Sequence, residues 1–297
     1  MPTTLQSDLL TPQAATAQAS TATAPNGLRY GRFGRLDASH TTPAEIARLA
    51  GSVPATLAAA LANHAYLFVP LALSAARMAS DDHTALPLND DALNDDTLND
   101  DTLIAPLATS TLMEKAICHR NAAVDGTEYV FLSSRLHNDR FALAFEFFIN
   151  IAHNYVDAAG VPTAFSDLAW SQVAANVKGE TSIDAWEQRA DALGQSPLYS
   201  PVDSQSDSRR RTASLVPHTG GVVMNDKARK AYDEAAFADT LAIYLLSMYL
   251  DFDYADLRER EYPLIAAPAL ADRLRAVHQL FPSNAGYKFE ILYRRRA

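Results

Sequence analysis

The stretch Phe141–Gly160, FALAFEFFINIAHNYVDAAG, decides the fold, because it is long and apolar enough to form a helix buried on most sides. At about 100° per residue, its polar side chains fall on one narrow stripe, and aromatic and aliphatic residues fill most of the remaining circumference. The stripe consists of Glu146, Asn150, His153 and Asp157. This polar edge must therefore be either hydrated or paired inside the protein.

Glu146, His153 and Asp157 are candidate metal ligands, since two carboxylates and an imidazole on one helical face resemble part of a helix-bundle iron or manganese site. One helix supplies only part of such a site, and no histidine in the chain stands three residues after a glutamate. The alternative interpretation is a solvated or hydrogen-bonded edge without a metal. No catalytic residue is predicted, and cofactor-binding residues stay unassigned.

Two further polar groups flank this helix. Cys118 beside His119 is a candidate thiolate with a neighbouring base. Adjacent residues of a helix point about 100° apart, however, and buried structural cysteines are commoner, so we interpret Cys118 as a buried structural cysteine. The run RLHNDR, Arg135–Arg140, can hold a substrate. We interpret it instead as the loop before the long helix, with Asn138 or Asp139 as the N-cap.

Composition places the chain among ordinary globular proteins. It has 297 residues, 48% of them hydrophobic, and a single cysteine, which excludes an intramolecular disulfide and suits a reducing cytoplasm. The N-terminus has no basic start followed by an apolar run, so no signal peptide is expected. Asn63, His64 and Pro70 interrupt the longest apolar run, which therefore indicates a buried core segment and no membrane span.

The acidity of the protein is concentrated in one segment. Eight aspartates and no Lys or Arg lie between Asp81 and Asp101, which leaves a net charge of −2 for the rest of the chain. Here the repeat LNDDALNDDTLNDDTL, Leu88–Leu103, has a period of five, which matches neither helix nor strand. It lacks the glycine turn and closing glutamate of a calcium loop, so a solvated insert is expected. No clustering of Lys and Arg that would indicate a nucleic-acid-binding surface stands out in the sequence.

The pattern predicts an α+β fold that is predominantly helical and has a small antiparallel sheet. Helices are expected at about 105–120, 140–158, 228–260 and 267–280, and strands in TEYVFLSS and in GYKFEILYR near the C-terminus. Gly220 and Gly221 are expected to turn a hairpin. Six segments follow: a disordered tail (1–27), an N-terminal helix-turn-helix-like unit (28–80), an acidic insert (81–104), a central helical core (105–199), a mobile loop (200–214), and C-terminal helices with a terminal strand (215–297).

Three pieces of the chain together resemble a known family. They are GRLDAS (Gly34–Ser39), YLFVPLALSAARM (Tyr66–Met78) and FALAFEFFINIA (Phe141–Ala152). In this order they are similar to the MbnC-type partner proteins of multinuclear iron enzymes that modify ribosomal peptides, as in methanobactin biosynthesis. The resemblance implies a subunit without chemistry of its own, which forms a heterodimer with an iron enzyme and helps present a precursor peptide.

The leading hypothesis is therefore a cytoplasmic, non-catalytic partner subunit in peptide biosynthesis, acting by protein–protein interaction in an iron enzyme complex. It needs no cofactor of its own, and iron comes through the partner. The alternative is a helix-bundle iron or manganese enzyme for a small molecule, with Glu146, His153 and Asp157 binding the metal directly. A helix-turn-helix regulator is the second alternative. Its second helix offers Ala, Leu and Thr, which read DNA poorly, so no nucleic-acid partner is expected.

Overall fold

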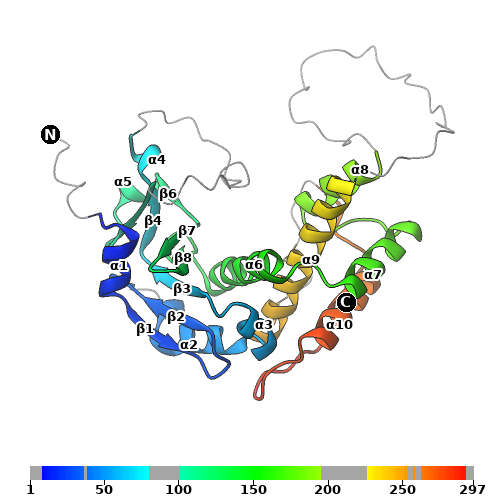
Figure 1. The fold of residues 1–297 in the computed structure, drawn as a ribbon, viewed down its shortest axis with the longest axis horizontal. Helices are drawn as coiled ribbons and strands as arrows, with labels where there is room; N and C mark the ends of the chain where they lie inside the picture. Colours follow the sequence, from blue (N-terminus) through cyan, green and yellow to red (C-terminus); the bar gives the residue numbers. More distant parts are fainter. Residues whose placement is uncertain are drawn as a thin grey trace, which may run out of the picture. The chain divides into compact units, whose positions relative to one another are not determined.

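The computed structural model describes residues 9–36, 39–79, 101–194, 226–252, 257 and 262–291. Its helices are α1 (Pro12–Gln18), η2 (Ser39–Thr41), α2 (Pro43–Ser52), α3 (Ala55–Ala60), α4 (Ala75–Ala79), α5 (Ser110–Met113), α6 (Arg140–Ala159), α7 (Thr163–Ala174), α8 (Ile183–Ala192), α9 (Asp226–Tyr249) and α10 (Ala267–Leu280) (Figure 1). Its strands are β1 (Ser20–Thr23), β2 (Arg29–Arg32), β3 (His64–Val69), β4 (Leu71–Ser74), β5 (Thr102–Ala105), β6 (Ala116–Ile117), β7 (His119–Val124) and β8 (Thr127–Ser133).

These elements confirm the expected α+β class with helix predominating. The described residues divide into two compact units. Unit 1 lies within residues 1–159, 241–252 and 277–297, and unit 2 lies within residues 160–240 and 253–276. None of the helices in the described ranges combines the length and the apolarity needed to cross a membrane.

Unit 1 contains two sheets. The larger has the order β1-β2-β3-β8-β7, with parallel pairing of β3 to β2 and β8 and antiparallel pairing at both outer positions. The smaller, β5-β4-β6, is the small antiparallel sheet that the sequence predicts. Pro70 separates β3 from β4 and Cys118 separates β6 from β7, so the chain passes between the sheets at two single-residue joints.

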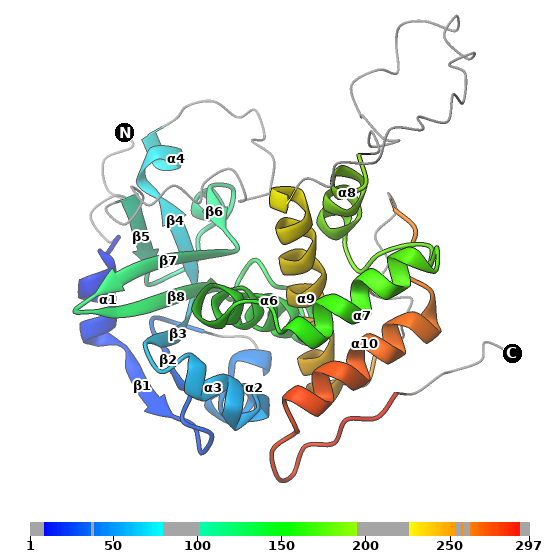
Figure 2. The same cartoon turned by 45° about the vertical axis from the view of Figure 1, so that its right-hand side comes forward.

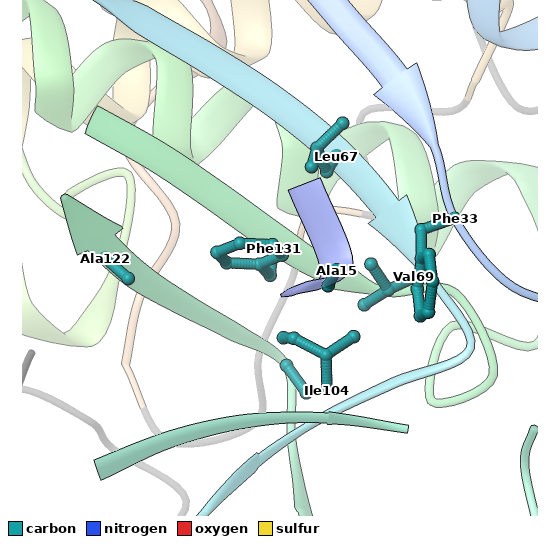
Figure 3. Close-up of a cluster of buried hydrophobic side chains, with 8 residues drawn as sticks. Ala15, Phe33, Leu67, Val69, Ile104, Ala122 and Phe131 are labelled. Carbon is teal, nitrogen blue, oxygen red and sulfur yellow. The ribbon is translucent and has the colours of Figure 1, made fainter. Parts of the chain in front are cut away.

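Strand β3 is buried on both faces, because its side chains alternate between two cores. Leu67 and Val69 join a cluster with Phe131 of β8 and Ala15 of α1 (Figure 3). Residues of the opposite face pack on α6, where Phe147 lies 5.3 Å from the Tyr66 ring and 5.7 Å from the Phe68 ring. Helices α1 and α6 therefore cover opposite faces of this strand (Figures 1 and 2).

Helix α6 is the predicted long helix, and its start is capped as expected. The Asp139 carboxylate accepts a hydrogen bond from the Ala142 amide at 2.7 Å. Helix α2 is capped in the same way, since the Thr42 hydroxyl accepts from the Glu45 amide at 3.2 Å. The expected strand TEYVFLSS is β8, and the helix expected at 267–280 is α10.

The expected disordered tail at 1–27 is wrong from residue 9 onward. Thr11 caps α1 with Pro12 following it, the same Thr-Pro signal that starts α2. Helix α1 is held in place because Ala15 is fully buried in the core of unit 1. The segment 28–80 also differs from a purely helical unit. The apolar run around Pro70 forms strands β3 and β4, and the proline sits between them, where no ladder hydrogen bond is needed.

The helix expected at 105–120 is wrong. Only the single turn α5 is helical there, and β6 and β7 follow because their backbones pair with β4 and β8. Tertiary pairing therefore overrides the local helix propensity. The acidic insert ends earlier than residue 104, since Thr102–Ala105 is strand β5. Residues 80–100 and the Gly220–Gly221 hairpin lie outside the described residues, as does the loop at 200–214.

The expected C-terminal strand is absent from its described part, up to Ile291. Its alternating aromatic residues pack without a strand partner. The Phe289 ring centroid lies 5.0 Å from the rings of Tyr244 (edge-to-face) and His278 (tilted), and the Tyr287 hydroxyl donates to the Arg48 carbonyl at 2.8 Å. The alternating aromatic side chains therefore anchor one side of this segment to the rest of unit 1 and do not form a strand.

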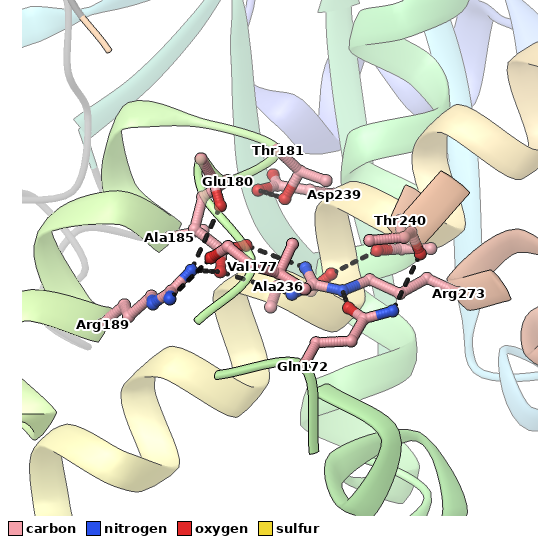
Figure 4. Close-up of polar contacts among 12 residues, drawn as sticks. Gln172, Val177, Glu180, Thr181, Ala185, Arg189, Ala236, Asp239, Thr240 and Arg273 are labelled. Atoms are coloured by element: carbon pink, nitrogen blue, oxygen red, sulfur yellow. Dashed lines mark hydrogen bonds and ion pairs between the residues drawn. The ribbon is translucent and has the colours of Figure 1, made fainter. Parts of the chain in front are cut away.

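Unit 2 is helical and is built around a buried ion cluster (Figure 4). Helices α7 and α10 lie side by side, where the Gln172 side chain donates to the Ala269 carbonyl at 2.9 Å (Figure 2). The segment at Glu180 pairs with the segment before α10 through a bridge to Leu264. This close pairing requires glycine at position 179, where φ is +83° and an added Cβ would collide with the Leu264 carbonyl.

Candidate functional site

The structure separates the three residues that the sequence offers as metal ligands. Glu146 points toward the sheets of unit 1 and its side chain is 16% exposed. His153 and Asp157, further along α6, are exposed. Within the described ranges, these three side chains do not form a cluster, and Glu146 belongs to a different group.

That set consists of Cys118, His137 and Glu146. One ligand atom from each lies within 4.8 Å of the other two. Among the described residues, this is the one group of three or more His, Cys, Asp or Glu side chains that meets this distance. We refer to these three residues as the Cys-His-Glu cluster.

A β-hairpin and a capped helix bring the cluster together. Strands β7 and β8 are joined by Asp125 and Gly126, both with positive φ, as in a two-residue type I′ turn. Cys118, just before β7, therefore lies opposite Ser133 at the end of β8, and its carbonyl accepts from the Ser133 amide at 2.9 Å. The chain then turns and reaches His137 before α6 begins.

His137 carries the most informative atom of the cluster. The residue is 7% exposed, and its Nε2 is buried without a hydrogen-bond partner. The ring hydrogen-bonds the Cys118 backbone, and since Nε2 has no partner, this bond belongs to Nδ1. Burial lowers the pKa of His137 below 6.5, although Glu146 and the hydrogen bond to Cys118 oppose the shift. The ring is thus neutral at pH 7, with an Nε2 lone pair available to a ligand.

Glu146 is ionised and held in position. Its Oε1 accepts hydrogen bonds from His119 Nδ1 at 2.7 Å and from Asn150 Nδ2 at 3.2 Å. Burial by itself raises the pKa of Glu146, but the hydrogen bond and charge of His119, together with His137 and Asn150, outweigh burial and hold the pKa below 4.5. Both side-chain hydrogen bonds fall on Oε1, so Oε2 stays available as a ligand.

The three side chains match the ligands of a borderline-soft divalent cation. Thiolate, imidazole and carboxylate all bind Zn²⁺ in proteins, whereas Mg²⁺ and Ca²⁺ prefer oxygen alone. A thiolate nucleophile with His137 as base is the competing chemistry. The anionic Glu146 disfavours it, because a neighbouring like charge disfavours ionisation of the thiol. A bound cation removes that conflict.

From the sequence alone, Cys118 is interpreted as a buried structural cysteine and His137 as part of the loop before α6, so nothing connects the two residues. The signal that pairs them is the Asp125-Gly126 dipeptide directly before the β-rich run TEYVFLS, an indicator of a two-residue hairpin. A hairpin centred there places position 118 opposite position 133, close to His137.

Comparison with known proteins finds no matching family model, no matching curated protein and no matching solved structure. The function of the chain is therefore argued from the site itself.

Proposed function

We propose that the protein binds one divalent transition-metal ion, Zn²⁺ or an ion of similar ligand preference, through Cys118, His137 and Glu146. The observation that carries the proposal is the buried, unpartnered Nε2 of His137. A buried polar atom without a hydrogen bond costs about 1–3 kcal/mol, so such atoms are rare unless another group pairs with them. A metal ion is a group of that kind, and the other two ligands lie within reach.

The protonation states of the cluster support the same proposal. Metal ligands must be deprotonated, and a histidine ligand commonly donates its other ring nitrogen to a carbonyl or carboxylate. The neutral His137 ring donates from Nδ1 to the Cys118 carbonyl, and Glu146 is ionised. A divalent cation balances the charge of Glu146 and of a Cys118 thiolate. The ring and the carboxylate are therefore already in the forms that bind a cation.

A chelator-competition titration with Zn²⁺ tests the proposal on the tag-free full-length protein. Wild type should bind one equivalent, and Cys118→Ser, His137→Leu and Glu146→Gln should each bind at least about 100-fold more weakly, beyond the 10- to 100-fold typical of outer-shell changes. His153→Ala is the matched control, since this exposed histidine lies on the same helix as Glu146. It should bind as wild type does.

Alkylation supplies an independent readout, because Cys118 is the single cysteine in the chain. Stoichiometric Zn²⁺ should slow its reaction with iodoacetamide, and EDTA should restore the rate. Wild type that binds no metal, or binds it no better than the three variants, contradicts the proposal. Preference for Mn²⁺ or Fe²⁺ with binding lost in His153→Ala contradicts it as well, and favours the helix-face site instead.

The partner role implied by the family resemblance stays a separate prediction. A subunit that clamps an iron enzyme should co-purify with that enzyme from its native host, and a chain that elutes alone as a monomer contradicts this role. A metal ion held by the Cys-His-Glu cluster is a function of the chain's own residues. The two proposals are therefore tested independently.

A further inference from the structure

The Cys-His-Glu cluster supplies three ligands, one fewer than a structural zinc site uses. Structural zinc sites are almost always closed by four protein ligands, whereas catalytic ones keep a position for water or substrate. In the described part of the chain no fourth His, Cys, Asp or Glu joins the mutual 4.8 Å set. His119 is a further donor in direct contact with the cluster, since it hydrogen-bonds Glu146 at 2.7 Å, so its role decides which kind of site this is.

The contacts of His119 fit an outer-shell residue. Its Nδ1 lies 2.7 Å from Glu146 Oε1, and since an ionised carboxylate only accepts, the ring donates. Outer-shell partners of this type fix the orientation of a ligating carboxylate. Asn150 donates to the same oxygen. Since His119 is also absent from the mutual 4.8 Å set, we assign it as a positioning residue for Glu146.

The exposure of the cluster is uneven. His137 is buried, whereas the side chain of Glu146 is 16% exposed and that of His119 is 28% exposed. Cys118 is half-buried. Solvent therefore reaches the carboxylate side of the cluster, while the imidazole ligand is sealed from water.

We infer, on the basis of the proposed function, that the bound metal keeps one coordination position open for an external donor. The ligand class is a small monodentate Lewis base, such as water, a thiolate or a carboxylate. Three protein ligands, an outer-shell histidine and a solvent-reachable carboxylate side all point to this arrangement. It makes the site a place where a small molecule or peptide side chain binds directly to the metal.

Cobalt substitution tests the inference, with sodium azide as the probe. Co²⁺-loaded wild type should show a thiolate-to-cobalt charge-transfer band, and azide should shift the visible d–d bands in a saturable, one-to-one manner. His119→Ala should bind Co²⁺ about 10- to 100-fold more weakly. It should keep the sulfur band and still respond to azide. His153→Ala should match wild type in every respect.

A closed site gives the opposite pattern. If His119 is the fourth ligand, wild type ignores azide and only His119→Ala responds, which overturns the open position while leaving metal binding intact. Failure of wild type to bind Co²⁺ or Zn²⁺ overturns the proposed function itself, and the open position with it. The sulfur band separates these two failures, because it is present in the first and absent in the second.

Discussion

Two polar clusters among the described residues each contain a glutamate and end in opposite states. In unit 2, Glu180 accepts from Arg273 at 2.8 Å, from Arg189 at 3.1 Å and from the Tyr232 hydroxyl at 2.8 Å. Arg273 Nε also donates a hydrogen bond to the Gln172 side-chain oxygen at 2.7 Å. Figure 4 shows the two arginines meeting Glu180 from α8 and α10.

In unit 1, the Cys-His-Glu cluster has hydrogen bonds to Glu146, but the buried Nε2 of His137 has no hydrogen-bond partner. The difference teaches how to separate structure from function among buried polar groups. A cluster in which donors and acceptors are all matched has no reason to bind anything further. A cluster that leaves a buried acceptor unmatched, on a residue close to a thiol and a carboxylate, is incomplete, and we propose that a cation completes it.

The largest expected effect comes from disrupting the cluster around Glu180 in unit 2. Arg273→Met leaves the fully buried Glu180 without its bidentate partner, and removing one member of a buried pair typically costs about 3–5 kcal/mol. Urea denaturation measures the loss. Arg275→Met is the control, since Arg275 pairs with Asp272 on the exposed surface and should change stability little. Equal losses in both variants would show that the unit 2 cluster is not structural.

His137→Leu should produce the opposite result in unit 1. It removes the unpartnered Nε2 and one hydrogen bond while keeping a side chain of similar bulk, so metal-free stability should stay within about 1 kcal/mol of wild type. Zn²⁺ affinity should fall at least about 100-fold, or about 2.7 kcal/mol. Denaturation and chelator competition on the same sample measure both quantities. A large stability loss with unchanged affinity would make this cluster structural too.

Asn150→Leu tests a hydrogen-bond donor at the edge of the Cys-His-Glu cluster. The buried amide donates to the Glu146 carboxylate, and losing an outer-shell donor should weaken Zn²⁺ binding about tenfold. The variant should still bind one equivalent in the same titration. Complete loss of binding would mean that Asn150 does more than orient Glu146.

The two units should also differ in the direction of their pH dependence. Glu146 and His137 both have lowered pKa values, so the stability they contribute to the metal-free protein is present above their unfolded pKa values and lost as pH falls. In unit 2, burial raises the pKa of Asp239 to about 7, although Thr181 and Ser182 hydrogen-bond it. Its contribution is present below the unfolded pKa of 3.8 and is lost as pH rises through about 7.

Denaturation of two variants at pH 5 and pH 8 separates these contributions. Compared with wild type, Asp239→Asn should lose less stability between pH 5 and pH 8, because the cost of ionising a buried carboxyl is gone. His137→Leu should lose less between pH 8 and pH 5. Profiles parallel to wild type would contradict the assignment of these groups.

The sequence predicts the α+β class, α6 with its cap, α10 and β8, because each of these depends on local pattern. It misses α1, although Thr11 and Pro12 repeat the signal at Thr42 and Pro43. It also misses β7, whose residues have helix-forming neighbours and become a strand only by pairing with β8. Local information therefore identifies α6 and β8, whereas β7 depends on its pairing with β8.

The same limit explains the candidate site. Helical spacing alone groups Glu146 with His153 and Asp157, and Glu146 is the one of the three that the cluster contains. The other two members stand 19 residues apart in the chain and meet across the hairpin at Asp125 and Gly126. Finding them requires the pairing register of β7 and β8. The Asp125-Gly126 dipeptide indicates that register, whereas helical periodicity does not.

X-ray absorption at the zinc edge of the Zn²⁺-loaded protein tests the central claim most directly, because it reports the atoms bound to the metal. The Cys-His-Glu cluster predicts one sulfur neighbour at about 2.3 Å, with imidazole and carboxylate neighbours at about 2.0–2.2 Å. The sulfur shell should vanish in Cys118→Ser. A first shell without sulfur in wild type would contradict the account, since the metal would then lie away from Cys118.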